Sequence, residues 1–462
     1  MLDASPLVGI AVGPLFRGEA ALQKALAMIR DHALDPLGVY QVHAVPDYSH
    51  GRIVPGLAVA SAREKRPLSG YDTAMDPALE PIAEKVHAGQ RLTADDGHLL
   101  LHTRDLHTLG RLANQVRRQR HGDTAYYNIN RHLNYSNLCI LSCKFCEFKR
   151  KPGQDGSYQF SLDEIRAQAA SARDNGATEM HVVGGLHPKL PFSYYTDLIR
   201  AIHDEAPQIH VKAFTAVEIV HLARISKRAV RKDFPGAVRA VLEDLVEAGL
   251  NSLPGGGAEV FDDRVHDEAF RGKIRSDEWL TVHRAAHELG LKSNATMLYG
   301  HVESPEDRIE HLCRLREEQD HAIEHNLPGR FQTIIPLPFF PDGSELEHLP
   351  GPSGIDNLRM IAIARLMLDN FDHVKAFWIM QTLPMAQVML DYGADDIDGT
   401  VVWYDITKVG GASTHQEVTV ADLKRAIREA GYRPVERDTL YRRVRRDGAN
   451  WQLDEADAMA TA

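Results

Sequence analysis

Three of the chain's 4 cysteines lie within eight residues, and they are the clearest sign of chemistry in its 462 residues. Cys139, Cys143 and Cys146 are separated by three and then two residues. A loop with thiolates at this spacing can bind three irons of a four-iron cluster, one sulfur to each iron. The fourth iron then keeps an open position, as catalytic metal centres do. The spacing therefore predicts a reactive iron–sulfur centre.

Two other uses of these cysteines compete with that prediction. A structural zinc site needs a fourth ligand, and His132 is close enough in sequence to supply it, but the second cysteine pair of a zinc knuckle is missing. Disulfides are disfavoured because a large chain with few cysteines and no basic, then apolar, N-terminal segment is expected to stay in a reducing compartment. The fourth cysteine, Cys313, falls in an amphipathic helical pattern, which predicts a buried, inert thiol.

Composition narrows the classes of partner. Lys and Arg total 53 against 64 Asp and Glu, a formal net charge of −11, which disfavours a nucleic-acid partner held by a broad basic surface. No apolar run reaches the roughly 18 residues that a membrane span needs. We expect a cytoplasmic protein without membrane or nucleic-acid partners.

The elements that must position the cysteines follow a regular alternation. Short apolar runs alternate with amphipathic patterns of 10 to 20 residues, such as 161–176, 193–206, 237–249, 277–290 and 356–370. Strand–helix alternation of about eight units predicts an α/β fold, a (β/α)8 TIM-type barrel, with working residues at the C-terminal strand ends. The expected strands are 125–134, 178–185, 210–217, 250–256, 292–300, 330–339, 375–380 and 400–404.

Four regions follow from this pattern. Residues 1–76 form an N-terminal extension without a recognisable motif, and 77–124 a mainly helical accessory region packed on the barrel. The barrel covers 125–415, with turns expected at 391–400 and a candidate lid at Gly410 and Gly411. Residues 416–462 are expected to form a helix, an exposed basic stretch and a frayed end.

Several polar or glycine-rich positions fall at the expected strand ends. Gly184 and Gly185 permit close approach of a backbone to a ligand, although an ordinary turn explains the pair equally well. Three successive glycines, Gly255 to Gly257, expose amides suited to an anion, with Glu259 just beyond. Asn294 and Thr296 share the inward face of a strand, where a cofactor can satisfy their hydrogen bonds.

Charged side chains at these ends are candidates for binding and proton transfer. Glu218 is suited to accept hydrogen bonds from ribose hydroxyls, with Thr215 beside it. Lys212 either binds substrate or only marks the barrel rim. His301 lies at the rim, where a histidine can exchange protons near neutral pH.

The Cys-x3-Cys-x2-Cys loop, with Phe145 before its last thiol, resembles the cluster loop of the radical S-adenosylmethionine (SAM) superfamily. The resemblance implies a [4Fe-4S] cluster whose open iron binds SAM, and an electron donor such as flavodoxin or ferredoxin. It also implies that Gly184 and Gly185 contact the SAM amino group, here through main chain because Leu186 stands where an acidic residue is common.

From about residue 79 to 415 the stretches NINRHLNYSN, HVVGGLHPKL, HVKAFTAVEI, SLPGGGAEVF and NATMLYGHVE resemble the aminodeoxyfutalosine synthase family. The implied reaction adds the 5′-deoxyadenosyl radical of SAM to 3-[(1-carboxyvinyl)oxy]benzoate, with aryl migration and decarboxylation, in menaquinone biosynthesis. This small dicarboxylate needs cations or amides around it, and those available are Lys212, Arg271, His187 and the glycine amides. By location, His187 or His301 is the candidate general base.

Two other functions stay open. A hydrogen-abstracting enzyme of the dehypoxanthine futalosine cyclase or F0 synthase type shares the cluster loop and would release free 5′-deoxyadenosine. A non-catalytic metal-binding protein would not cleave SAM at all.

Overall fold

The computed structural model of the chain describes residues 75–228, 230–400 and 417–454. The chain divides into two units, Met1–Ala74 and Met75–Ala462, so everything described belongs to the second. The predicted N-terminal extension, except its last two residues, and the candidate lid at Gly410 and Gly411 lie outside the described residues.

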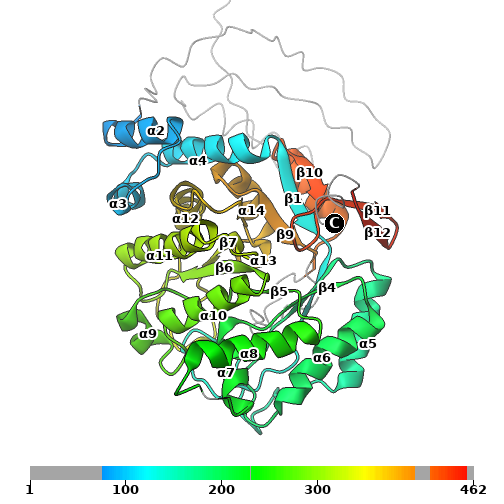
Figure 1. Ribbon diagram of the computed structural model, residues 1–462. Coiled ribbons are helices and arrows are strands. Elements are labelled where there is room, and N and C mark those ends of the chain that lie inside the picture. The colour runs from blue at the N-terminus through cyan, green and yellow to red at the C-terminus, as the bar shows by residue number, and fades with distance from the viewer. Residues whose placement is uncertain (1–74, 229, 401–416, 455–462) are drawn as a thin grey trace, which may run out of the picture. The chain divides into compact units, whose positions relative to one another are not determined.

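A parallel sheet of seven strands in chain order forms the centre of the fold and confirms the predicted α/β architecture (Figure 1). Every neighbouring pair is parallel, as strand–helix–strand units require. The strands are β2 (Asn130–Leu133), β3 (Glu179–Val182), β4 (His210–Ala213), β5 (Ser252–Leu253), β6 (Lys292–Tyr299), β7 (Phe331–Pro338) and β8 (His373–Val374).

An eighth strand, β9 (Asp396–Gly399), connects the last strand of this sheet to the first. Beyond β8, the Ala376 amide donates to the Asp396 carbonyl at 2.8 Å. On its other side β9 pairs in parallel with β1 (Thr124–Asn128), which continues through one residue into β2. The sheet therefore curls into a (β/α)8-type barrel.

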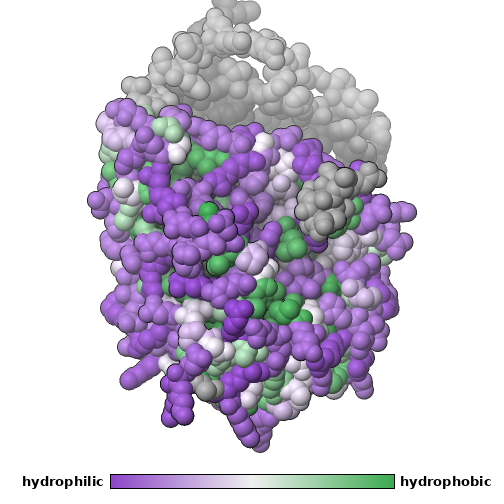
Figure 2. All heavy atoms as spheres, in the orientation of Figure 1, coloured by the Kyte–Doolittle hydropathy of each residue, from purple (hydrophilic) through white to green (hydrophobic). Residues whose placement is uncertain are grey.

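Helices cover the outside of the sheet, and several begin at a capping box directly after a strand-end loop. Ser161, Thr215, Ser304 and Ser353 each accept a backbone hydrogen bond from an acidic residue three positions later, whose carboxylate bonds back. The face of the molecule shown in Figure 2 is mostly polar. The helices are α5 (Leu162–Asp174), α6 (Phe192–Glu205), α7 (Ala216–Ile225), α8 (Phe234–Glu247), α9 (Asp263–Ala269), α10 (Ser276–Glu288), α11 (Pro305–Glu324) and α12 (Gly354–Met367). Cys313 is buried in α11, as predicted.

The residues before the barrel are helical, as their pattern predicts. They form η1 (Pro77–Leu79), α2 (Glu80–His87), α3 (Ala94–His102) and α4 (Leu106–His121). Helix α4 packs against α12, and α3 contacts α11 and α12 (Figure 1).

The prediction of a strand at 375–380 is wrong. Strand β8 ends at Val374, and Trp378–Gln381 form the short helix α13, followed by α14 (Leu383–Met389) and η2 (Leu390–Tyr392). The eighth strand is β9, where a turn was expected, and all but the first residue of the predicted strand 400–404 lie outside the described residues. The acidic sequence of β9 carries little strand propensity, and pairing with both β1 and the chain after β8 stabilises it instead.

The C-terminal segment is more ordered than its charge predicts. After α15 (Val420–Glu429), strand β10 (Arg433–Glu436) pairs with β1, and β11 (Val444–Asp447) pairs with β12 (Asn450–Leu453). Arg437 is buried and ion-paired with Asp396 at 2.6 Å. The expected exposed basic stretch therefore includes a strand and a buried ion pair. In the part of the chain that the structure describes, no helix is both long and apolar enough to cross a membrane.

Candidate functional site

A cavity of about 310 Å³ occupies the inside of the barrel. Successive side chains of a strand point to opposite faces, so alternate residues line the cavity, among them Glu179 and His181 of β3 and Asn294, Thr296 and Leu298 of β6. Of the predicted site residues, those that line the cavity are Phe145, Cys146, Gly184, Thr215, Glu218, Gly255, Gly256, Gly257, Glu259, Asn294 and Thr296.

The cysteine loop lies at one end of this cavity, with Cys146 in its wall. Cys143 is buried, while Cys139 and Cys146 are half-buried. Two lysines hold the loop by its carbonyls: Lys149 Nζ donates to Cys143 O at 2.8 Å and Cys146 O at 3.2 Å, and Lys151 Nζ donates to Cys139 O at 3.0 Å. These bonds fix the loop backbone and leave the sulfurs free for metal.

The donor set suits a cluster better than a single ion. Three thiolates leave one corner of a four-iron cluster open, whereas a structural zinc site needs a fourth protein ligand. Burial raises the pKa of the Cys143 thiol to about 11 and that of Cys146 above its usual value, so binding metal must displace the protons. The amide of Leu141 donates to Cys139 Sγ at 3.4 Å, a bond of the kind that tunes iron–sulfur clusters.

The paired glycines pack tightly beside this loop. A Cβ on Gly185 would lie 2.4 Å from the carbonyl oxygen of Leu138, and one on Gly184 would lie 2.6 Å from the Tyr135 ring. Only glycine fits at either position, and Gly184 also lines the cavity.

Glu218 is more fully hydrogen-bonded than a free acceptor for ribose would be. It is the third residue of α7, and its carboxylate accepts from Thr215 N and Oγ1, Tyr135 Oη and Gly184 N, all at 2.8 to 3.0 Å. Burial raises its pKa to about 7, and the hydrogen bonds from Thr215, Tyr135 and Gly184 limit the rise. Glu218 therefore ties the glycine turn to α7 and also faces the cavity.

The triple glycine also approaches the barrel backbone. A Cβ on Gly255 would lie 2.7 Å from backbone atoms of Asn294 and Ala295 in β6, and Thr296 Oγ1 donates to the Gly255 carbonyl at 2.7 Å. Asn294 accepts a hydrogen bond from Gln332 at 3.4 Å. The predicted inward face of β6 thus serves partly to fix the glycine turn.

Lys273, rather than Arg271, is a further cation near the cysteines, besides Lys149 and Lys151. Arg271 is exposed and does not line the cavity, so its predicted contact with substrate has no geometric support. Lys273 forms a buried ion pair with Glu259 and lies 5.3 Å from the Phe145 ring centroid. Only Gly272 separates the lysine from the arginine, and sequence alone did not distinguish them.

Lys212 forms a structural ion pair with Glu179. Its ammonium lies 2.8 Å from Glu179 Oε2 with both side chains 2% exposed, and only Glu179 lines the cavity. Burial alone would raise the pKa of Glu179, but the charges of Lys212 and Lys375 hold it well below its ordinary value. The lysine therefore neither marks an exposed rim nor lines the cavity to bind substrate.

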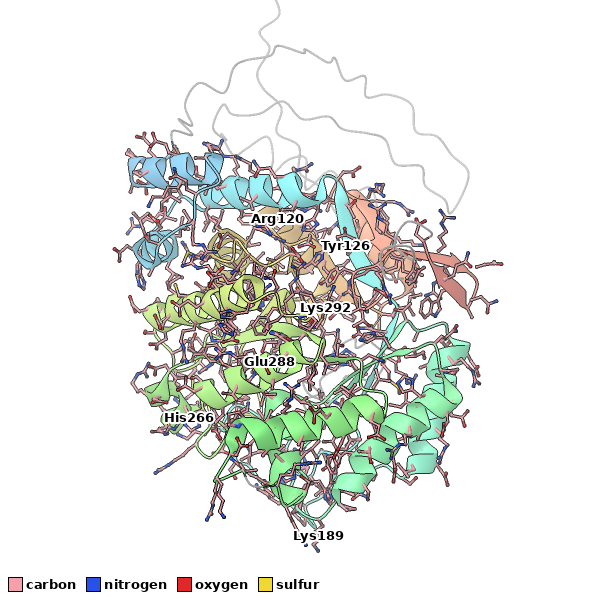
Figure 3. The ribbon with its side chains drawn as sticks, in the orientation of Figure 1. Arg120, Tyr126, Lys189, His266, Glu288 and Lys292 are labelled. Carbon is pink, nitrogen blue, oxygen red and sulfur yellow. The ribbon has the colours of Figure 1, made fainter. Side chains whose placement is uncertain are left out.

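Neither predicted general base lines the cavity. His187 Nδ1 accepts from the amides of Lys189 and Leu190 at 3.1 and 3.0 Å, and Lys189 lies at the outer edge of the molecule (Figure 3). His301 lies behind Phe145, with ring centroids 6.5 Å apart, and its Nε2 bonds the Leu298 carbonyl at 3.0 Å. Both histidines shape turns.

Sequence reasoning missed the other end of the cavity. Lys375 and Asp398 line it as an ion pair at 3.2 Å. The stacked rings of His132 and His181, 4.5 Å apart, lie there too. No motif joins these residues, because β2, β3, β9 and the chain after β8 contribute them separately; alternation along the predicted strands was the one available signal.

A separate group, His121, His373 and Asp395, has the spacing of metal ligands but does not line the cavity. His373 Nδ1 contacts Asp395 at 2.6 Å, and Arg365 forms a buried ion pair with the same carboxylate. These contacts make the group a charge-compensated network between α4, α12 and β8.

Comparison with known proteins adds to this geometry. The chain matches the family model of the radical SAM superfamily over residues 133–315 and that of the CofH/MqnC C-terminal region over residues 329–448. It is 45% identical to aminodeoxyfutalosine synthase of Thermus thermophilus, covering 80% of this chain and 97% of the relative. With the Streptomyces coelicolor enzyme of the same name it shares 41% identity, over 80% and 95%.

Among solved structures, methylornithine synthase matches with a TM-score of 0.59, covering 76% of this chain and 97% of that chain. At 19% identity this likeness concerns the fold alone. The first family model contains the cysteine loop, and the second contains Lys375 and Asp398.

Proposed function

The chain belongs to the aminodeoxyfutalosine synthase family of radical SAM enzymes, and we propose that it converts SAM and 3-[(1-carboxyvinyl)oxy]benzoate to 6-amino-6-deoxyfutalosine in menaquinone biosynthesis. The observation that carries the proposal is 45% identity along nearly the whole length of a synthase. The cavity with the three cysteines at one end is the site that this reaction needs.

The cysteines Cys139, Cys143 and Cys146 would hold the [4Fe-4S] cluster. A cluster with SAM on its open iron supplies a 5′-deoxyadenosyl radical after reduction by one electron. The carbonyl of Gly184, which lines the cavity, would accept from the amino group of SAM, because the amides of Gly184 and Gly185 already donate to Glu218 and to the Ser136 carbonyl. The tight packing of both glycines keeps that backbone in place. Flavodoxin or ferredoxin is the electron donor that we propose.

The chain's remaining task is to orient substrate and exclude water. Apolar side chains dominate the wall between the two ends, among them Leu298, Ile335, Leu337, Phe339 and Phe377. A dry wall protects a reactive carbon radical from side reactions, and fixed orientation alone can supply on the order of 7 kcal/mol of rate acceleration. The proposed pocket for the enol ether lies along this wall.

A hydrogen-abstracting reaction is the second candidate, because the C-terminal part of the chain matches the CofH/MqnC model, whose description does not specify the synthase reaction. Such an enzyme would release free 5′-deoxyadenosine instead of joining the adenosyl group to its substrate.

Mass spectrometry separates the two. Anaerobically reconstituted full-length enzyme receives SAM, dithionite and the enol-ether benzoate. We expect a decarboxylated adenosyl–substrate adduct, and none from the Cys146→Ala variant. Free 5′-deoxyadenosine without adduct, from protein with a full cluster, would refute the synthase assignment.

A further inference from the structure

The charges that line the cavity are unevenly distributed. Among the described residues its wall contains six carboxylates and one lysine, Lys375; the acids are Glu147, Glu179, Glu218, Glu259, Asp342 and Asp398. A dianionic substrate cannot bind in such a cavity unless a cation pairs with its charge, because an unpaired charge is costly to bury. Burial lowers the pKa of His132 to about 4 and that of His181 well below its ordinary value, so both rings are neutral at pH 7.

The Lys375 ammonium group has more hydrogen-bond donors than its protein contacts use. Its side chain is buried, and within the described residues Asp398 Oδ1, at 3.2 Å, is the one hydrogen-bond partner of its ammonium. An ammonium group carries three donors, so two can reach a ligand in the cavity. Asp398 has a φ of 70°, a conformation that a non-glycine residue rarely adopts, and this strained position holds its carboxylate beside the lysine.

The lysine lies far from the cysteines. Asn130 is in register with Glu179 at the start of β3, and its side chain donates to Asp398 at 3.3 Å. Lys375, Asp398, Asn130 and Glu179 therefore form one layer, which we call the cavity floor. Glu179 begins β3 and Val182 ends it, about 10 Å further along the strand, and Gly184 follows two residues beyond that end. The floor and the cofactor end are thus separated along the barrel axis.

We propose that Lys375 binds the ring carboxylate of an aromatic acid substrate, so that the aryl group lies against the stacked His132 and His181 and the enol ether points to the cofactor end. This proposal rests on the proposed function. The enol carboxylate does not fit the same place, because it is bonded to the alkene that must reach the adenosyl carbon. Two other lysines contact carboxylates of the cavity wall without lining it, and both are already paired: Lys212 with Glu179, and Lys273 with Glu259.

The test compares two substrates: the enol-ether benzoate and 2-phenoxyacrylate, which lacks only the ring carboxylate. A charge-assisted hydrogen bond gives the wild-type enzyme roughly a 10- to 100-fold preference in kcat/KM for the benzoate. We expect Lys375→Met to bring this ratio close to one. Equilibrium dialysis of the benzoate against unreduced enzyme should show a similar loss of affinity without any turnover.

Two further variants keep the test decisive. Lys375→Met leaves Asp398 unpaired and can disturb folding, so Lys375→Met/Asp398→Asn removes both charges and must lose the preference as well. The matched control is Lys273→Met, which also removes a buried, paired lysine; its rate can change, but its preference for the benzoate should persist.

The outcomes separate the two proposals. Failure of the wild-type enzyme to form adduct would refute the proposed function itself. Normal adduct formation with an undiminished preference in both Lys375 variants, or loss of the preference in Lys273→Met instead, would overturn the assignment of the ring carboxylate to Lys375.

Discussion

The two ends of the barrel cavity are built by different means. At the cofactor end, where the cysteine loop lies, close packing of glycine backbone shapes the cavity: Gly184, Gly185 and Gly255 each pack where a Cβ would collide with neighbouring atoms. At the floor, the cavity is instead shaped by buried ion pairs, Lys212–Glu179 and Lys375–Asp398. We therefore expect changes of shape to matter most at the cofactor end and changes of charge at the floor, although Glu218 and the buried pair Lys273–Glu259 make the cofactor end sensitive to charge as well.

Breaking the floor pair Lys212–Glu179 should give the largest effect. Lys212→Met leaves the Glu179 carboxylate buried without its main cation, which costs about 3 to 5 kcal/mol of unfolding free energy. Urea unfolding monitored by circular dichroism measures the change. The double variant Lys212→Met/Glu179→Gln should recover a large part of the loss; equal destabilisation of both proteins would show that the charge is not the cause.

At the cofactor end, the raised pKa of Glu218 predicts that the free energy of unfolding depends on pH. Burial raises its pKa from 4.5 to about 7, so the folded protein keeps a proton that the unfolded chain releases. The contribution of this bound proton to the free energy of unfolding is complete below pH 4.5 and is lost as the pH rises to about 7, a change of about 3 kcal/mol. Unfolding free energies of wild type and Glu218→Gln between pH 5 and 8 should therefore differ in slope, and parallel curves would contradict the prediction.

Shape at the cofactor end can be tested with two adjacent glycines. Gly255→Ala places a Cβ 2.7 Å from the β6 backbone, whereas Gly256→Ala meets only a Thr215 methyl at 3.1 Å. The first change should cost about 1 to 3 kcal/mol of stability and weaken SAM binding, and the second far less. Thermal unfolding and equilibrium dialysis of SAM measure both. Equal effects would mean that the close approach of Gly255 is unimportant.

The smallest expected effect concerns charge near the cysteines. Lys273→Met removes a buried cation that acts electrostatically on Cys143 and Cys146, so the reduction potential of the bound cluster should fall on the order of tens of millivolts. Arg271→Met, two residues away and exposed, should leave it unchanged. Potentiometric titration of the two holoproteins provides the comparison. Identical shifts of the reduction potential in both variants would show that Lys273 does not act on the cluster.

The sequence by itself determined the cofactor end and the fold class. Cys139, Cys143 and Cys146 are neighbours in the chain, so their spacing was readable without a fold. The alternation of apolar runs and amphipathic stretches was sufficient to predict the barrel, because each unit forms from local contacts. Glycine pairs and triplets were visible for the same reason.

Only the tertiary structure decided the cavity floor. Asn130, Glu179, Lys375 and Asp398 come from different strands or strand ends, and each looks like an ordinary polar residue until the barrel brings them into one layer. Strand β9 is stabilised by its two neighbours rather than by its own acidic sequence. The choice of Lys273 over Arg271 depended on which side chain the turn after α9 directs inward, which no local pattern specifies.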